Sequence, residues 1–198
     1  ERHDAIWYRM GDKTYPLSHN RIRHIYEDKE QQLWIATDGS INRYDYATRQ
    51  FIHYNIVDNT GTYNTNWTYY IFEDTAGQLW ISTCLGGIFV VDKRKLMQST
   101  SGQYIAEQNY SVHNGLSGMF INQIIPDNEG NVWVLLYNNK GIDKINPRTR
   151  EVTKLFADEL TGEKSPNYLL CDEDGLLWVG FHGGVMRINP KDESQQSI

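Results

Sequence analysis

The stretch Asp127-Asn128-Glu129-Gly130-Asn131-Val132-Trp133-Val134 reads as a tight turn that leads directly into a strand. An aspartate opens such a turn with its side-chain acceptor, and a glycine supplies the positive φ that closes it. Valine and tryptophan favour extended backbone. The stretch therefore predicts a turn followed by a β-strand.

The same phrase occurs four times along the chain. Its copies begin at Asp28, Asp74, Asp127 and Asp172, and their tryptophans stand at 34, 80, 133 and 178, in steps of 46, 53 and 45 residues. The first copy has Gln31 where the others have glycine. Units of this length, built from four short strands, are the sequence signature of propeller blades. We predict an all-β fold, a β-propeller segment of about four four-stranded antiparallel blades.

Short apolar segments bounded by Gly, Asp and Asn clusters give the expected strands. They are 22–26, 33–37, 41–45 and 51–54; then 67–72, 79–83, 88–91 and an outer strand within 104–112; then 120–125, 132–137, 142–145 and 152–156; and finally 168–171, 177–181 and 185–188. No long segment has a period of 3.6 residues, so very little helix is expected.

The expected organisation is a single propeller segment over residues 1–198. Residues 1–19 are the last strand of a preceding blade plus a linker, and the blades span 20–57, 58–113, 114–160 and 161–198, the last with an incomplete outer strand. One arrangement is a partial arc of a larger propeller, or a ring closed by a second chain. The alternative is a closed four-bladed ring in which residues 5–10 complete the last sheet. The chain starts at Glu1 with no signal peptide, so we expect a segment of a longer protein.

Composition narrows the possible partners. The net charge is −6 and there is no run of Lys or Arg, which argues against nucleic acid. No run of 18 apolar residues is present, so membrane attachment is expected only through other parts of a longer protein. Cys84 and Cys171 lie at non-equivalent places in their repeats and are expected to be separate thiols.

The repeated residues are expected to be structural. Tryptophans at one fixed strand position predict core packing, and aspartates at one fixed turn position predict turn formation rather than catalysis. The six histidines have no zinc-site spacing, and no nucleophile motif or phosphate loop occurs. We therefore expect binding rather than catalysis, with no catalytic residue, metal or cofactor.

Ligands of propellers contact residues that break the repeat, in loops at the ends of the central channel. Aromatic faces can stack on sugar rings, while Asn and Lys can satisfy hydroxyl or anionic groups. The candidate ligand-binding residues are Tyr63, Asn64, Trp67, Tyr69, Phe120, Tyr137, Asn139, Lys140, Phe181 and His182. Four asparagines are expected to share one repeat position and to bond the backbone: Asn20, Asn66, Asn122 and Asn167.

The repeats resemble the two-component-regulator propeller repeat. They share the order of its motifs: I-x-x-I, then E-D or P-D, then G-x-L-W-I, then G-G-I, then Y-D or I-N-P. Residues 71–92, 124–147 and 169–190 carry it, and residues 22–45 carry it more weakly. Residues 114–117 and 15–22 are similar to the phrase that links blades in this family.

The resemblance implies a sensor context. Such repeats form the periplasmic part of Bacteroides-type hybrid histidine kinases, which respond to glycan-derived oligosaccharides and regulate polysaccharide-use genes. It implies an oligosaccharide ligand, with other blades or a second copy of the chain as partners. Because propellers of this family close with more blades, it favours the arc. The alternatives are a non-catalytic interaction or dimerisation propeller and, less favoured, a glycan hydrolase or lyase.

Overall fold

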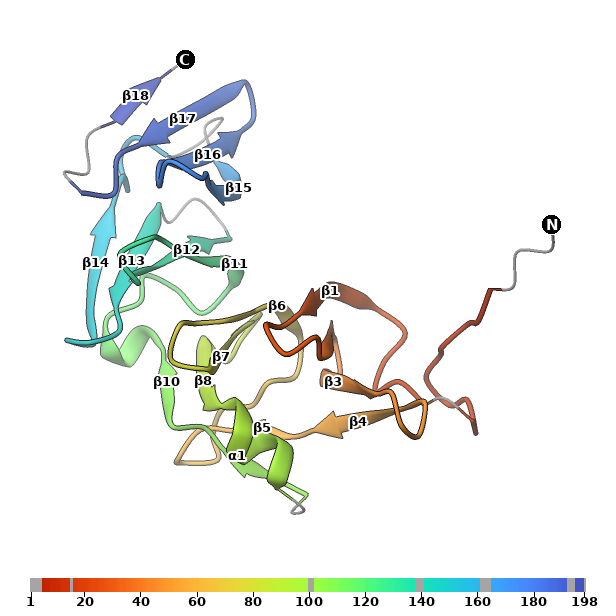
Figure 1. The fold of residues 1–198 in the computed structure, drawn as a ribbon. Helices are drawn as coiled ribbons and strands as arrows, with labels where there is room; N and C mark the ends of the chain where they lie inside the picture. Colours follow the sequence, from red (N-terminus) through yellow and green to blue (C-terminus); the bar gives the residue numbers. More distant parts are fainter. Residues whose placement is uncertain are drawn as a thin grey trace.

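The chain folds into four antiparallel four-stranded sheets that follow one another along an open arc (Figure 1). The computed structural model describes residues 5–14, 16–99, 102–137, 141–160, 165–191 and 195–197. The first sheet contains β1 (Ile22–Glu27), β2 (Leu33–Thr37), β3 (Ser40–Asp45) and β4 (Gln50–Tyr54). The second contains β6 (Thr68–Glu73), β7 (Gln78–Thr83), β8 (Ile88–Asp92) and β10 (Gln108–Tyr110). The third contains β11 (Ile121–Pro126), β12 (Val132–Leu136), β13 (Ile142–Asn146) and β14 (Glu151–Leu155), and the fourth β15 (Pro166–Cys171), β16 (Leu177–Phe181), β17 (Gly184–Ile188) and β18 (Gln195–Ser197).

The second sheet carries an insertion before its outer strand. It contains α1 (Lys93–Gln98) and β9 (Tyr104–Ile105), and β9 pairs in parallel with β5 (Ile56–Val57). A 3₁₀ turn, η1 (Val112–Asn114), follows β10. The expected outer strand within 104–112 is therefore divided between two partners. Among the described residues, no helix is long and apolar enough to cross a bilayer.

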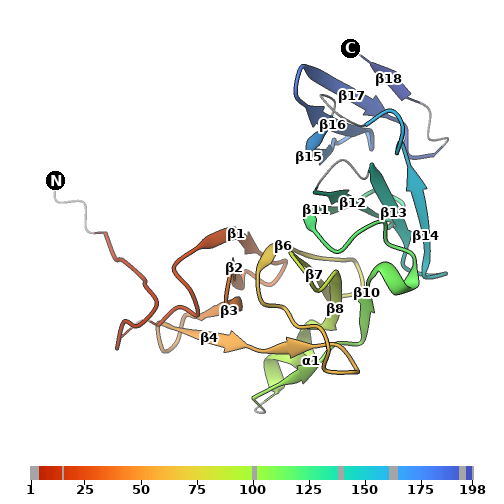
Figure 2. The same ribbon diagram turned by 180° about the vertical axis from the view of Figure 1, so that it is seen from behind.

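The innermost strands β1, β6, β11 and β15 pack on one another along the concave side of the arc (Figures 1 and 2). The outermost strands β4, β10, β14 and β18 lie on the convex side. The open arc and the all-β prediction are confirmed. The fourth sheet takes its outer strand from the chain's own tail, as three residues that pair with β17.

Residues 5–10 form no strand within this chain, so the alternative of a closed four-bladed ring is wrong, whereas their place in a preceding blade stays a prediction. In residues 5–14 the only backbone pairing is an isolated bridge from Arg9 to Pro16. Ile6 and Trp7 are 64% and 72% exposed. This segment lies at the far end of the arc from β18 (Figure 1), where Tyr8 packs against Tyr44 and Phe51 of the first sheet, so it does not complete the fourth sheet.

Three apolar clusters fill the joints between successive sheets. Trp34 belongs to the first cluster, Trp80 to the second and Trp133 to the third, and all three indoles are at most 1% exposed. Trp178, in the last sheet, is only partly buried. The prediction that the repeated tryptophans are packing residues is confirmed, and both cysteines are free thiols as expected.

Each turn aspartate binds its own turn and its own tryptophan. Asp127 Oδ1 accepts hydrogen bonds from the backbone N–H groups of Glu129 and Asn131, both at 2.9 Å. Its Oδ2 accepts one from the Trp133 indole Nε1–H, also at 2.9 Å. The equivalent indole bonds measure 2.9 Å for Asp28–Trp34, 2.9 Å for Asp74–Trp80 and 2.6 Å for Asp172–Trp178. The prediction that these aspartates are turn formers is confirmed. The hydrogen bond to the indole was not predicted from the sequence.

The first repeat keeps the turn without its glycine. Gln31 adopts φ 61°, close to the 78°, 85° and 80° of Gly77, Gly130 and Gly175. The backbone bonds across the turn are unchanged, with Gln31 N donating to Asp28 O at 2.9 Å. The left-handed conformation therefore costs conformational free energy at Gln31, while the pairing of the two strands is unchanged.

A buried lysine ties the first sheet to the second. Lys93 Nζ, at the start of α1, lies 3.0 Å from Asp28 Oδ2 and 2.8 Å from Glu73 Oε1, and its side chain is 2% exposed. Burial acts to raise the pKa of Asp28, but hydrogen bonds from Trp34, the Gln32 backbone and Lys93 outweigh it and lower that pKa. The ion cluster therefore joins the turn of one sheet to the insertion of the next.

Replacing Asp127 by alanine is expected to lower the free energy of unfolding by about 3 kcal/mol, because a buried donor left unpaired costs about 1–3 kcal/mol. Chemical denaturation followed by tryptophan fluorescence measures it. Asp174→Ala, at an exposed turn position, is the control and should change stability by less than about 0.5 kcal/mol. Equal losses in the two variants would contradict the role given to the aspartate.

Gln31→Gly is expected to stabilise the protein by about 0.5–1 kcal/mol. Glycine removes the strain of the left-handed conformation, but it also raises the conformational entropy of the unfolded chain, which offsets part of the stabilisation. Gln31→Ala is the matched control and should leave stability nearly unchanged, since alanine carries the same strain. The reverse change, Gly130→Gln, has open space around the new Cβ and should cost about 1 kcal/mol through the backbone alone. A destabilised Gln31→Gly variant would show that the turn is held by the glutamine side chain.

Lys93→Met is expected to cost about 3–5 kcal/mol at pH 7, because it leaves Asp28 as a buried, uncompensated charge. The folded-state pKa of Asp28 lies below its unfolded value, so its stabilisation is present above about pH 4 and is lost as the pH falls through the folded-state pKa. The difference between wild type and variant should therefore shrink between pH 7 and about pH 3. Denaturation curves over this range measure it, and a difference independent of pH would exclude the ion cluster as its source.

Candidate functional site

A pocket at the start of β6 and β11 brings together four of the predicted ligand-binding residues. The pocket has a volume of about 220 Å³ and opens between the second and third sheets. We call it the aromatic pocket, lined by Trp67, Tyr69, Cys84, Phe120, Ile121, Asn122 and Tyr137.

Each innermost strand begins with a one-residue bulge, at an arginine, a tyrosine and two asparagines in chain order. The register shifts fall at Arg23, Tyr69, Asn122 and Asn167. A bulge redirects the side chain of the extra residue and is frequent beside binding sites. Tyr69 and Asn122 are the two bulge residues that line the aromatic pocket.

This register corrects the expectation for the four asparagines. Asn122 and Asn167 are equivalent to Arg23 and Tyr69, whereas Asn20 and Asn66 each lie three residues before a bulge. The spacing to the repeated tryptophan agrees: Asn122 and Asn167 stand 11 residues before it, whereas Asn20 and Asn66 stand 14 residues before it.

Trp67 has a strained backbone at the mouth of the pocket. Its φ is 61°, a value that bulky residues rarely adopt. Two backbone bonds hold it there: Trp67 N donates to Asp38 O at 3.1 Å, and Cys84 N donates to Trp67 O at 3.0 Å. The indole remains 40% exposed. Strain of this kind is maintained by surrounding structure and is typical of functional sites.

Tyr69 lies beside an ion pair from the first sheet. The Arg23 guanidinium is 4.5 Å from the centre of the Tyr69 ring, and Arg23 Nε donates to Asp38 Oδ1 at 2.7 Å. Burial raises the pKa of Tyr69, although the nearby Arg23 charge opposes this rise. The phenol therefore stays protonated at neutral pH and can donate a hydrogen bond to a ligand.

The opposite wall of the pocket belongs to the third sheet. Phe120 and Tyr137 have ring centres 6.2 Å apart, and Tyr137 N donates to Phe120 O at 2.9 Å. The two side chains are 39% and 60% exposed. Aromatic faces with a phenol and an amide between them suit a ligand that has both apolar faces and hydroxyl groups.

Cys84 is the thiol that lines the aromatic pocket. Burial raises the pKa of the Cys84 thiol, so this cysteine is a poor nucleophile. Within the part of the chain that the structure describes, no three His, Cys, Asp or Glu side chains are placed to hold a metal ion.

The remaining predicted residues lie elsewhere. Tyr63 lines a second pocket at the outer rim, and Asn64 Oδ1 accepts a hydrogen bond from Asn66 N at 2.9 Å. Phe181 packs against the third apolar cluster, and His182 is exposed in the turn after β16. Asn139 and Lys140 lie outside the described residues. Sequence reasoning missed Arg23, Asp38 and Cys84 near the aromatic pocket, and no motif marks them.

The chain matches a family model described as "Two component regulator propeller" at residues 16–39 and 115–138. These two stretches run from the linker before β1 to the start of the β2–β3 turn, and through the corresponding part of the third sheet. A search of curated protein sequences gives no match.

Solved structures give closer matches. Two structures of the extracellular domain of BT4673 from B. thetaiotaomicron, described once as a one component system and once as a hybrid two component system, are 99% identical, with a TM-score of 0.97. The match covers 100% of this chain and 27% of that domain, so the chain spans about a quarter of its length. The extracellular domain of BT3049 from the same organism is 20% identical with a TM-score of 0.72, over 96% of this chain and 26% of that one. Virginiamycin B lyase from Staphylococcus aureus is 15% identical with a TM-score of 0.68, over 93% of this chain and 58% of the lyase.

Proposed function

We propose that this chain, which carries the repeats of the two-component-regulator propeller family, is a ligand-binding segment in the extracytoplasmic, periplasmic part of a sensor protein. The near-identical match to an extracellular domain described as part of a hybrid two component system supports this context. The segment itself does not catalyse a reaction, and it contributes to a switch that regulates genes for polysaccharide use.

The ligand is an oligosaccharide held in the aromatic pocket. The observation that carries this proposal is the convergence of Trp67, Tyr69, Phe120 and Tyr137 on one pocket of about 220 Å³. Aromatic rings present flat faces to the C–H surface of a sugar, and the Tyr69 phenol and Asn122 amide can bond its hydroxyls. A volume of this size is below the range of about 300–1,000 Å³ typical of small-molecule sites, so the pocket holds one sugar residue of a longer ligand.

The position of the pocket suits a switch. Trp67 is bonded to Asp38 of the first sheet and to Cys84 of its own sheet, while Phe120 and Tyr137 belong to the third. A sugar seated among them contacts two sheets directly and a third through the Trp67 backbone. It can therefore favour one relative placement of the sheets through differential affinity, which is what a two-state receptor requires.

A non-catalytic interaction propeller is the second candidate. The ends of the arc expose apolar side chains on the innermost strands, among them Ile25 at 60% and Leu170 at 52%. Such faces are normally covered by another blade or another copy of the chain. Light scattering with and without glycans separates a constitutive dimer from one that depends on a ligand.

A lyase function is less well supported. The likeness to virginiamycin B lyase at 15% identity is a likeness of fold. In the aromatic pocket the thiol of Cys84 has a raised pKa and lacks a histidine among the lining residues. Absence of product after incubation with plant and host glycans would remove this candidate.

Trp67→Ala is expected to weaken oligosaccharide binding at least about tenfold, roughly 1.4 kcal/mol, because it removes a stacking surface. The measurement is calorimetric titration of the longer extracellular domain that contains this sequence with a panel of neutral plant and host oligosaccharides. Tyr46→Ala, at an exposed aromatic residue in the β3–β4 hairpin outside the pocket, is the control and should leave affinity unchanged. No binding by any oligosaccharide, or equal binding by both variants, would contradict the proposal.

A further inference from the structure

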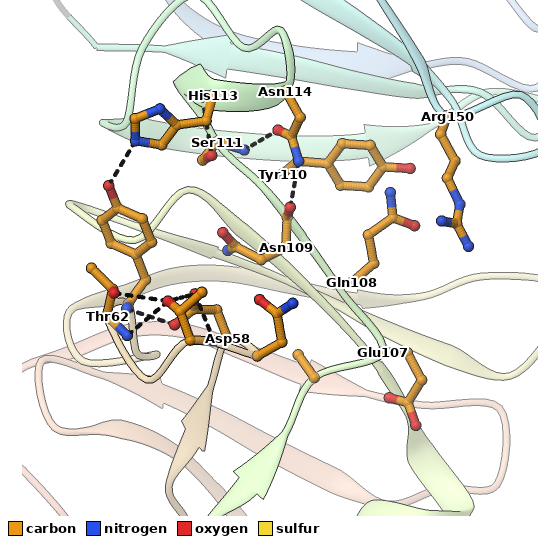
Figure 3. A pocket seen from close by; sticks show the side chains of 14 residues that line it. Asp58, Thr62, Glu107, Gln108, Asn109, Tyr110, Ser111, His113, Asn114 and Arg150 are labelled. Carbon is orange, nitrogen blue, oxygen red and sulfur yellow. Dashed lines mark hydrogen bonds between the residues drawn. The ribbon is translucent and has the colours of Figure 1, made fainter.

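The segment that joins the second sheet to the third leads into the aromatic pocket. It comprises residues 115–119, between η1 and β11, and it is followed by Phe120, part of the pocket wall. Hydrogen bonds of η1 fix its upstream end (Figure 3): Asn114 Oδ1 accepts from Ser111 N, and Asn114 Nδ2 donates to Asn109 O at 2.7 Å. We call residues 115–119 the joining segment.

One buried carboxylate holds the middle of the joining segment. Asp143, on β13, is 0% exposed and accepts two hydrogen bonds from Ser117. The backbone N–H donates to Oδ2 and the hydroxyl to Oδ1, both at 2.7 Å. No described cation lies within ion-pair distance of Asp143. We call this contact the Ser117–Asp143 anchor; it depends on a buried charge that no counter-ion touches.

The first sheet makes the same contact with a neutral side chain. Asn42 and Asp143 are equivalent, because each pairs with the residue after the repeated tryptophan of its sheet. Ser18 N donates to Asn42 Oδ1 at 3.1 Å, and Asn42 Nδ2 donates to the Ser18 hydroxyl at 2.8 Å. Ser18 and Ser117 both stand four residues before an innermost strand. The repeat can therefore hold this segment without a charge, and the third sheet differs by having a group that titrates.

The surroundings of Asp143 favour its neutral form. Burial raises the pKa of Asp143, although the hydrogen bonds from Ser117 and the charge of Lys154, its neighbour on β14, act to lower it. β12 places a valine opposite it, and the joining segment has no charged residue. The titratable groups of the apolar cluster at this joint are tyrosines, which titrate in the alkaline range. η1 contributes His113, which every variant below retains.

We propose that Asp143 is a positioning residue of the aromatic pocket, which holds the joining segment and through it Phe120, and holds them more firmly when its carboxyl is protonated. The protonated acid can adopt the arrangement of Asn42, with one oxygen accepting from Ser117 N–H and the other donating to the hydroxyl. Ser117 is only partly buried, so its hydroxyl hydrogen can then turn to water.

The direction of the pH dependence follows from linkage. The closed anchor binds a proton more readily than a hydrated Asp143 does, so protonation favours the closed anchor. The added stability is fully present below about pH 4, the ordinary range of an aspartate, and is lost as the pH rises through the raised pKa of Asp143. The bearing on ligand binding rests on the proposed function, whereas the anchor is a property of the free protein.

The test is hydrogen exchange of the longer extracellular domain without ligand, followed by mass spectrometry between pH 7 and about pH 4 and corrected for the intrinsic exchange rate. The Ser117 amide reports the anchor, and the Tyr137 amide, which donates to Phe120 O at 2.9 Å, reports the placement of Phe120. Protection of both amides should rise severalfold as the pH falls. Protection at both amides that does not change with pH would overturn the proposal.

Two variants assign the effect to Asp143. Asp143→Asn should keep the anchor closed and remove the rise in protection, whereas Asp174→Asn, at an exposed carboxylate, should keep the rise. Asp143→Ala should speed exchange at both amides at least about tenfold, because two hydrogen bonds to a charged group are lost. The same rise in Asp143→Asn as in the unaltered protein, or a Tyr137 amide unaffected by Asp143→Ala, would each contradict the role of Asp143.

The reciprocal change in the first sheet is an independent check. Asn42→Asp should give the Ser18 amide the pH dependence that Ser117 has in the unaltered protein. A Ser18 amide with pH-independent protection in this variant would show that a buried carboxylate at this position is not the source of the effect. None of these measurements uses a ligand, so absence of oligosaccharide binding would contradict the proposed function and leave this result standing.

Discussion

The structure depends on one hydrogen-bonded unit, the turn aspartate whose carboxylate holds both its own turn and the indole N–H of a tryptophan six residues later. One oxygen fixes the backbone of the turn, and the other satisfies a donor that would otherwise be buried without a partner. The large indole can therefore lie in the joint between sheets, where it contributes apolar area without an unsatisfied polar group. Repetition of this unit places one indole in each of the three joints between successive sheets, and the four sheets follow an arc.

The candidate binding residues lie at positions outside the repeated aspartate–tryptophan unit. The aspartate and tryptophan occupy the turn and second strand of each blade, so the loops before the innermost strand, the bulge that opens it, and the outer hairpins are free to vary. The aromatic pocket uses the first two of these places, at the joint of the second and third sheets.

The sequence predicted the strands and the packing role of Trp34, Trp80 and Trp133, because a repeated pattern reports a repeated environment. It also placed Trp67, Tyr69, Phe120 and Tyr137 among the ligand candidates, since each departs from the repeat. It did not predict the bulges at Arg23 or Asn122, because each is the second residue of its strand, where too few strand residues precede it to show a break in the alternation. The buried Lys93 could not be predicted either, because burial of a charged group depends on contacts between segments far apart in the sequence.

Hydrogen exchange of the tryptophan indole N–H groups, followed by NMR on ¹⁵N-labelled protein and assigned by single Trp→Phe replacements, tests the central claim most directly. The aspartate bonds predict that the indole protons of Trp34, Trp80 and Trp133 exchange orders of magnitude more slowly than that of the exposed Trp7. Asp127→Ala should release the Trp133 proton and leave the Trp34 proton protected. Exchange at Trp133 as fast as at Trp7 in the unaltered protein would contradict the account.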